Sequence, residues 1–181
     1  MTNRYAHLDK PFKKKYENSC LGNLFLSKDI LQKLFTWIKR KEHFFLFLGC
    51  PGCGKTQCAT ALYNWLCENG KEVRYVEWAK LLADLRHAYT THMTDQHILQ
   101  RYLDANYLII DDIKHEGFNE WARDRLYDVI DSRCTSELPT FISSNIREED
   151  MENIFGDRIS SRLLCSDNIR VSDWENDYRQ K

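Results

Sequence analysis

Eight residues, Gly-Cys-Pro-Gly-Cys-Gly-Lys-Thr at positions 49–56, have the types and spacing that bind a triphosphate. They fit the phosphate-loop pattern G-x-x-x-x-G-K-[ST], in which the lysine reaches the β- and γ-phosphates and the last hydroxyl lies on Mg²⁺. Glycines let backbone N–H groups approach phosphate oxygens, and the N-terminus of a following helix adds partial positive charge. We therefore predict a nucleotide site formed by Gly49, Pro51, Gly52, Cys53, Gly54, Lys55, Thr56 and Gln57.

Two carboxylates, Asp111 and Asp112, directly follow the apolar run Tyr107-Leu108-Ile109-Ile110. If this run is a parallel strand, its C-terminal end opens onto the ligand crevice. Asp111 is then placed to hold Mg²⁺ together with Thr56, through water, because Mg²⁺ keeps several of its waters. Asp112 is placed to orient or deprotonate the attacking water.

Further polar groups follow in the second half of the chain. The apolar run 140–143 delivers Ser144 and Asn145 to the same edge, where the Asn145 amide can both donate and accept a hydrogen bond and so fix the attacking water. Arg158 and Arg162 are four residues apart and share a helix face. Arginines of this kind can stabilise charge on a neighbouring subunit's γ-phosphate, although spacing alone leaves two solvated helix arginines as an alternative.

The cysteines favour reduced thiols. There are seven, an odd number, and no secretion signal precedes them. Cys50-x-x-Cys53 lies inside the phosphate loop and no second pair with zinc-site spacing follows, so we expect neither a structural metal nor a dedicated redox role. A milder hypothesis is that oxidation of this pair distorts the loop and blocks nucleotide binding.

The elements that position these groups alternate along the chain. Helical spacing of apolar residues starts after a Ser27 N-cap and ends at the basic residues 39–41. Strands are predicted at 44–48, 73–77, 106–111, 139–143 and 169–171, and helices at 57–68, 78–85, 98–103, 118–130 and, as two short pieces, 147–164. Strands that alternate with helices and lack hairpin turns predict a parallel sheet covered on both faces. We expect an α/β fold of the P-loop NTPase type with five parallel strands.

Composition limits the class of protein. The 181 residues carry a net charge of −1, so nucleic-acid binding requires a local patch or an assembly of subunits. Lys10 and Lys13–Lys15 are one such patch, with a solvated arm as the alternative. No apolar run approaches the roughly twenty residues that span a bilayer. The first residues lack the apolar core of a signal peptide, and we expect a cytoplasmic protein without membrane contact.

Five segments together resemble the AAA+ ATPases of the DnaC/DnaI helicase-loader and IstB transposition-helper group. They are G-C-P-G-C-G-K-T (49–56), L-I-I-D-D (108–112), E-W-A-R-D-R-L-Y-D-V-I-D-S-R (120–133), P-T-F-I-S-S-N (139–145) and G-D-R-I-S-S-R-L-L (156–164). The resemblance covers about residues 40–179 and implies ATP and Mg²⁺ as cofactors. It implies that Asn145 is the sensor and that Arg162 is the arginine finger, a role that Arg158 could share. From the residues and the resemblance together, we expect the catalytic residues to be Asp112, Asn145, Arg162 and Arg158.

The resemblance also implies partners and domains. It predicts an N-terminal arm and lead-in helix at 1–40, an AAA+ ATP-binding domain at 41–181 and no C-terminal helical lid. It implies a head-to-tail homo-oligomer formed with ATP, in which the helices at 78–103 line single-stranded DNA and offer Lys80, Arg86 and Arg101. The protein partner it implies is a replicative helicase or a transposase. Loaders usually carry a separate N-terminal domain that grips the helicase, whereas about forty residues precede the first strand here.

Three functions are therefore compared. The first is an ATPase that loads or remodels a replicative helicase on single-stranded DNA, with an IstB-type transposition helper as its close alternative. The second is a small metabolite kinase, which the acidic pair and the absence of an arginine-rich lid segment disfavour. The third is a nucleotide-dependent binding module without useful turnover, since Asp112 stands where a glutamate would be a faster base.

Overall fold

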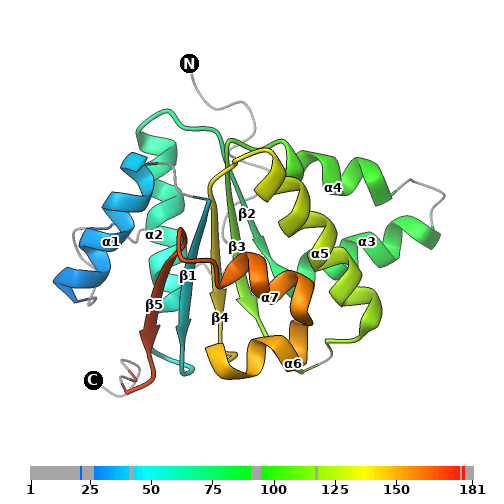
Figure 1. Ribbon diagram of the computed structural model, residues 1–181. Helices are drawn as coiled ribbons and strands as arrows, with labels where there is room; N and C mark the ends of the chain where they lie inside the picture. The colour runs from blue at the N-terminus through cyan, green and yellow to red at the C-terminus, as the bar shows by residue number, and fades with distance from the viewer. Residues whose placement is uncertain are drawn as a thin grey trace.

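A single parallel sheet organises the computed structural model, which describes residues 21, 27–40, 43–90, 95–116, 118–175 and 177. Its strands are β1 (Phe44–Gly49), β2 (Val73–Glu77), β3 (Tyr107–Ile113), β4 (Thr140–Ser144) and β5 (Ile169–Asp173). They lie in the order β2-β3-β4-β1-β5, and every neighbouring pair is parallel. All strands therefore end at one edge of the sheet, as the arrowheads in Figure 1 show. This confirms the predicted five-stranded α/β fold.

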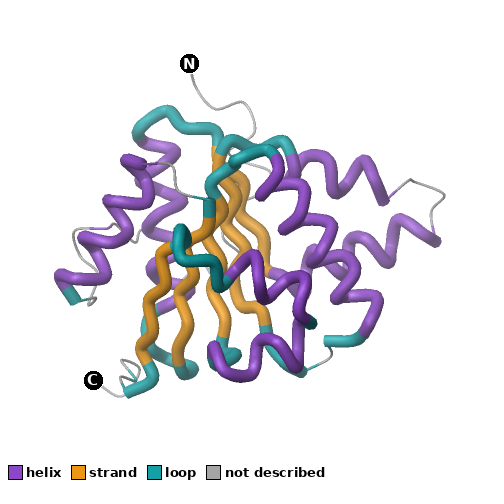
Figure 2. The backbone as a smooth tube through the Cα atoms, viewed as in Figure 1, coloured by secondary structure: helices purple, strands orange, loops and turns teal. Residues whose placement is uncertain are grey.

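Helices cover both faces of this sheet. They are α1 (Lys28–Arg40), α2 (Lys55–Glu68), α3 (Trp78–Thr90), α4 (Asp95–Leu103), α5 (Glu120–Thr135), α6 (Met151–Phe155) and α7 (Asp157–Leu163), with a 3₁₀ turn at Glu148–Asp150. One hydrophobic cluster joins α1 and α2 to one face of the sheet. A second cluster joins the five helices from α3 through α7 to the other face. Figure 2 shows the strands between these two layers of helices. Among the described residues no helix follows β5, and no described helix is long and apolar enough to cross a membrane.

The predicted ends of the helices are largely those observed. The Ser27 hydroxyl accepts from the Ile30 N–H at 3.3 Å, which confirms it as the N-cap of α1. At the end of α2, Gly70 N–H donates to the Cys67 carbonyl and Lys71 N–H to the Leu66 carbonyl, which is the Schellman arrangement. These caps fix where α1 begins and where α2 ends.

Some boundaries and faces differ from the prediction. α2 begins at Lys55 rather than at residue 57, β3 continues beyond Asp111 to Ile113, and β5 continues to Asp173. Within α1 the core-facing residues are Ile30, Leu34 and Trp37, and Phe35 is 44% exposed. Because Trp37 packs edge-on against Phe45 and Tyr107, α1 turns this ring rather than Phe35 toward the sheet. The proposed division of the chain at residues 40 and 41 stays a prediction, and residues 1–20 lie outside the described part.

A buried arginine ties the second layer of helices to the sheet. Arg133 of α5 is fully buried, and burial lowers its pKa to about 9, so that it remains a cation at neutral pH. Its guanidinium donates to five oxygens: the Thr140 hydroxyl and the carbonyl groups of Tyr102, Leu103, Ala105 and Pro139. It thereby satisfies carbonyl groups at the C-terminal end of α4 that no helical N–H can reach.

Candidate active site

The phosphate loop connects β1 to α2 and is built for an anion. Gly52 and Gly54 have φ of 95° and 90°, the left-handed region that favours glycine. Gly54 is the N-cap of α2 and provides no side-chain cap, so the first N–H groups of this helix stay directed at the loop. An α-helix that starts without a side-chain cap offers both N–H donors and the positive end of its dipole.

Gly49 is required where β1 leaves the sheet. A Cβ at this position would lie 2.3 Å from the Asp173 carbonyl oxygen and 2.6 Å from the Cys53 Sγ. The same Asp173 oxygen accepts from the Cys50 N–H at 3.1 Å, so the end of β5 supports the first turn of the loop. Any side chain at position 49 would separate β1 from β5.

Lys55 is held across the loop. Its side chain is 7% exposed, and its ammonium donates to the carbonyl oxygens of Gly49 at 2.7 Å and Cys50 at 2.8 Å. The third contact of the ammonium is the Cys53 Sγ at 3.6 Å. Burial raises the pKa of the Cys53 thiol although the nearby ammonium of Lys55 opposes this, so the thiol is neutral at physiological pH. The loop thus holds the Lys55 ammonium group next to the N-terminus of α2.

Asp111 lies in β3 at the C-terminal edge of the sheet, and β4 separates this strand from β1. Its carboxylate is fully buried and accepts two hydroxyl hydrogen bonds, one from Tyr75 of β2 at 2.7 Å and one from Ser143 of β4. The Asp111 charge is close enough to Cys58 of α2 to add to the rise of the Cys58 pKa, whose main cause is burial. Asp111 therefore lies beside the first turns of α2, as the sequence predicts.

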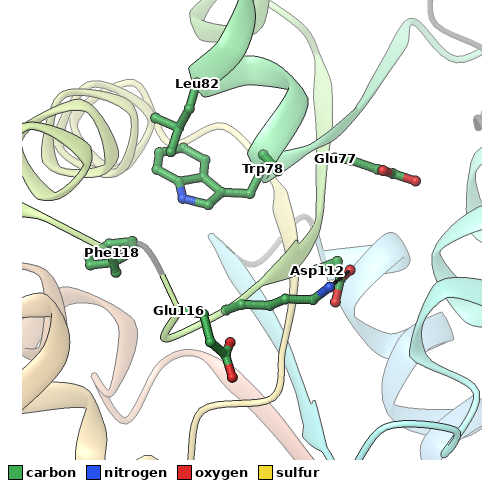
Figure 3. Close-up of a pocket in the computed structure, with 8 residues that line it drawn as sticks. Glu77, Trp78, Leu82, Asp112, Glu116 and Phe118 are labelled. Atoms are coloured by element: carbon green, nitrogen blue, oxygen red, sulfur yellow. Dashed lines mark ion pairs between the residues drawn. The ribbon is translucent and has the colours of Figure 1, made fainter.

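Asp112 follows in an unusual backbone conformation. Its φ is 66°, which is rare for a residue other than glycine. Its carboxylate pairs with the Lys114 ammonium at 2.9 Å, and this partner raises the Lys114 pKa. Figure 3 shows Asp112 at the wall of a pocket at the ends of β2 and β3, which Glu77, Trp78 and Phe118 also line. Unlike Asp111, it therefore faces open space.

Asn145 lies just beyond β4 beside the acidic pair. Its backbone N–H donates to the Ile113 carbonyl at 3.4 Å, which holds the residue against the end of β3. Its side-chain oxygen Oδ1 is buried and has no hydrogen-bond partner among the described residues. A buried amide oxygen without a partner is rare in folded proteins and indicates a missing water or ligand.

The two arginines lie elsewhere. α7 packs with α5 in the layer opposite α2 (Figure 1), where Arg162 pairs with Asp131 of α5 at 2.5 Å. The guanidinium groups of Arg158 and Arg162 lie 5.9 Å and 5.2 Å from the centre of the Tyr127 ring. The structure thus brings together the loop, the acidic pair and Asn145, but it does not bring the arginines to the same place.

A hollow adjoins the phosphate loop on the side of β5. It is bounded by the start of α1, with Ser27 and Ile30, and by the end of β5, with Asp173 and Trp174. Asp173, which lines this hollow, pairs with Gly49 at the start of the phosphate loop in the sheet.

Sequence reasoning missed five side chains that contact the predicted site residues. Tyr75 and Ser143 hold Asp111, Lys114 pairs with Asp112, and Tyr127 and Asp131 hold Arg162. One signal was available: Ser143 stands in a strand buried at every position, where a hydroxyl must find a hydrogen-bond partner.

The fold and the site define a class. A parallel sheet with the order β2-β3-β4-β1-β5, a phosphate loop after β1 and an acidic pair at the end of β3 make an ATP-binding P-loop protein of the AAA+ class. More narrowly, the chain belongs to the family of IstB-like ATP binding proteins, whose sequence profile matches residues 25–167.

The curated relatives that the chain resembles share about a quarter of their aligned residues with it. The chain is 27% identical over 175 residues to the replicative helicase loader DnaC of Buchnera aphidicola subsp. Schizaphis graminum, covering 91% of this chain and 71% of that protein. It is 26% identical over 139 residues to the replicative helicase loader DnaC of Escherichia coli K12, covering 76% of this chain and 56% of that protein. A crystal structure of the DnaC helicase loader shares the fold with a TM-score of 0.74 at 20% identity, covering 88% of this chain and 98% of that one.

Proposed function

We propose that this chain hydrolyses ATP in an assembly of several copies and loads or remodels a replicative helicase on single-stranded DNA. The observation that carries the proposal is the division of the site within one chain. The phosphate loop, the acidic pair and Asn145 share one edge of the sheet, while Arg158 and Arg162 lie on the opposite layer. Curated relatives named replicative helicase loader support the choice of partner.

The residues at this edge fit a magnesium–nucleotide complex. The Thr56 hydroxyl and the carboxylate of Asp111 are hard oxygen donors of the kind Mg²⁺ prefers, and Mg²⁺ would neutralise charge on the phosphates. Lys55, already fixed beside the start of α2, would bind the β- and γ-phosphates. The remaining loop residues from Gly49 to Gln57 would donate backbone N–H groups, and the hollow beside β5 would hold the nucleoside.

Asp112 and Asn145 would act on the attacking water. Asp112 faces the open pocket at the end of β3, so its carboxylate can accept a proton from water there. The buried, unpartnered Oδ1 of Asn145 would accept the second hydrogen bond of that water. Two acceptors on one water orient its lone pair toward the γ-phosphate.

Arg162 would complete the site of the next copy. α7 packs in the layer opposite α2, and Arg162 is paired there with Asp131 of α5, so we assign its action to the nucleotide of the next copy. Contacts in which one surface meets a different surface of the next copy build rings or open spirals. Arg158, beside the same Tyr127 ring, would share or hold this role.

Contact with single-stranded DNA would involve α3 and α4, as the family resemblance implies. Lys80, Arg86 and Arg101 are all exposed there. Lys80 contacts Asp84 at 3.3 Å, and Arg86 lies over the Trp121 ring at 4.8 Å. DNA phosphates would compete with these contacts within the chain, so binding by a single copy would be weak and strongly salt-dependent.

The family name favours one second candidate, an IstB-type helper that directs a transposase to DNA. Both functions need ATP hydrolysis, assembly and DNA, so the protein partner separates them. A metabolite kinase would instead need an acceptor site beside the γ-phosphate and no contact between copies.

The test is ATP hydrolysis with and without single-stranded DNA, together with mass by light scattering and a helicase-loading assay. We expect ATP-dependent oligomers, stimulation by DNA, and transfer of a replicative helicase onto single-stranded DNA. Stimulation and assembly without any effect on a helicase would favour the transposase partner. A monomer in ATP whose hydrolysis is indifferent to DNA would refute the proposal.

A further inference from the structure

A bulge in β3 places two carboxylates opposite one serine. The register pairs Ile110 with Ile142 and then Ile113 with Ser144, so two residues of β3 lie opposite one residue of β4. Those two residues are Asp111 and Asp112, and the single residue is Ser143. This two-against-one pairing defines a β-bulge, a feature common next to active sites.

Ser143 contacts both members of the acidic pair. Its hydroxyl donates to one oxygen of the Asp111 carboxylate and accepts from the backbone N–H of Asp112 at 2.9 Å. The second bond holds the Asp112 peptide, whose φ of 66° requires support from the surrounding structure. One hydroxyl therefore couples the side chain of Asp111 to the backbone of Asp112.

Tyr75 holds the other oxygen of Asp111 from the opposite strand. Its hydroxyl donates to that oxygen at 2.7 Å. Hydroxyl groups from the strands on both sides of β3 thus hold the two oxygens of the Asp111 carboxylate.

The burial of Asp111 indicates what this arrangement serves. No ion pair in the described part of the chain includes Asp111, so its charge is offset by the two hydroxyl donors. A fully buried carboxylate is unfavourable unless a cation or several donors face it. Two of its lone pairs accept from Tyr75 and Ser143, and the remaining two stay available for metal-bound water.

We propose that Tyr75 and Ser143 are positioning residues of the magnesium site. Their hydroxyls fix the rotation of the Asp111 carboxylate, and Ser143 also fixes the peptide of Asp112. The inference rests on the proposed function, because it assigns the Asp111 carboxylate to nucleotide-bound Mg²⁺. The residues that touch the nucleotide or the metal remain those of the phosphate loop and the acidic pair.

The test measures binding of a fluorescent, non-hydrolysable ATP analogue with and without Mg²⁺. Wild-type protein should bind the analogue more tightly with Mg²⁺. In Ser143→Ala this gain should fall about tenfold, and in Tyr75→Phe about threefold, while affinity without Mg²⁺ stays within about twofold. Ser143→Thr keeps the hydroxyl and should restore most of the gain. A role in folding alone would lower the melting temperature and leave the gain unchanged.

Two matched controls lie in the same sheet. Ser144→Ala removes the neighbouring buried hydroxyl, which bonds to the Ile113 carbonyl, and Tyr107→Phe removes a phenol from the opposite end of β3. Both should keep the full gain from Mg²⁺. A full gain in both Ser143→Ala and Tyr75→Phe would overturn the positioning role alone, whereas no gain in wild-type protein would overturn the proposed function. If Ser143→Ala does not fold, Tyr75→Phe, which loses a single oxygen atom, decides the question.

Discussion

Two inactive variants should restore each other's activity when they are mixed. Arg162→Ala removes the arginine on α7, and Asp112→Asn removes the carboxylate at the end of β3. Each variant alone should lose ATP hydrolysis, Arg162→Ala by about 10³-fold, which is typical of a missing arginine finger. In a mixed assembly, however, an intact Arg162 from one variant can meet an intact Asp112 from the other.

The size of the recovery follows from the separation of the two places in the chain. Each contact between copies joins the nucleotide edge of one copy to the α7 surface of the next. In a random 1:1 mixture half of the copies carry each intact part, so about one quarter of the contacts are complete. The mixture should therefore hydrolyse ATP at about one quarter of the wild-type rate.

The variants should fold, which makes a negative result informative. The Arg162–Asp131 pair is partly exposed, with side chains 31% and 38% accessible, so it contributes about 1 kcal/mol or less. With the contact to the Tyr127 ring, Arg162→Ala should lower the melting temperature by about 2–8 °C. Arg125→Ala removes another α5 ion pair, with Asp128 at 3.1 Å, and serves as the control that keeps wild-type hydrolysis.

The assay is phosphate release at several mixing ratios, with light scattering to show that mixed oligomers form. The reasoning is refuted if Arg162→Ala and Arg158→Ala both hydrolyse ATP at the wild-type rate, or if mixed oligomers form without any recovery. The second result would mean that Arg162 acts on the nucleotide of its own chain, or on none.

Three other changes test particular contacts. Gly49→Ala should abolish nucleotide binding and destabilise the fold by about 1–3 kcal/mol, because its Cβ would lie 2.3 Å from the Asp173 carbonyl; denaturant unfolding measures the loss. Arg133→Met should destabilise by about 3–5 kcal/mol, since it removes the donor from carbonyl oxygens at the C-terminal end of α4; thermal unfolding should show a fall of about 6–20 °C. Oxidation of Cys50 and Cys53 to a disulfide should lower ATP affinity by at least about tenfold, because Cys53 lies 3.6 Å from the Lys55 ammonium; ATP binding before and after reduction measures it, and unchanged affinity in the oxidised protein would contradict the hypothesis.

The sequence predicts those parts of the molecule that local patterns determine. The phosphate loop is a continuous motif, and the apolar run before Asp111 is long enough to indicate a buried strand without further information. The cap at Ser27 follows from the preference of a single residue. For these elements the residues that set the structure are neighbours in the chain.

Contacts between distant strands could not be predicted in this way. The bulge at Asp111 and Asp112 depends on the register between β3 and β4, which lie about thirty residues apart. Tyr75 has the pattern of an ordinary strand residue, and only the packing of β2 beside β3 brings its hydroxyl to Asp111. The same holds for Arg133, whose acceptors come from two separate stretches of the chain, 102–105 and 139–140.

Two of the groups that the proposed hydrolysis needs beyond the phosphate loop already have partners within the chain. Asp112, the proposed base, is paired with Lys114 at 2.9 Å, and Arg162 is paired with Asp131. While Lys114 occupies the Asp112 carboxylate, water must compete for the same oxygens, and an arginine bound to its own α5 offers fewer donors to a neighbour. Both pairs are exposed enough to be worth about 1 kcal/mol each, so the γ-phosphate and the surface of a second copy can replace them at little expense. On the proposed function, a single copy therefore hydrolyses ATP slowly, and contact between copies changes the partners of both groups at once.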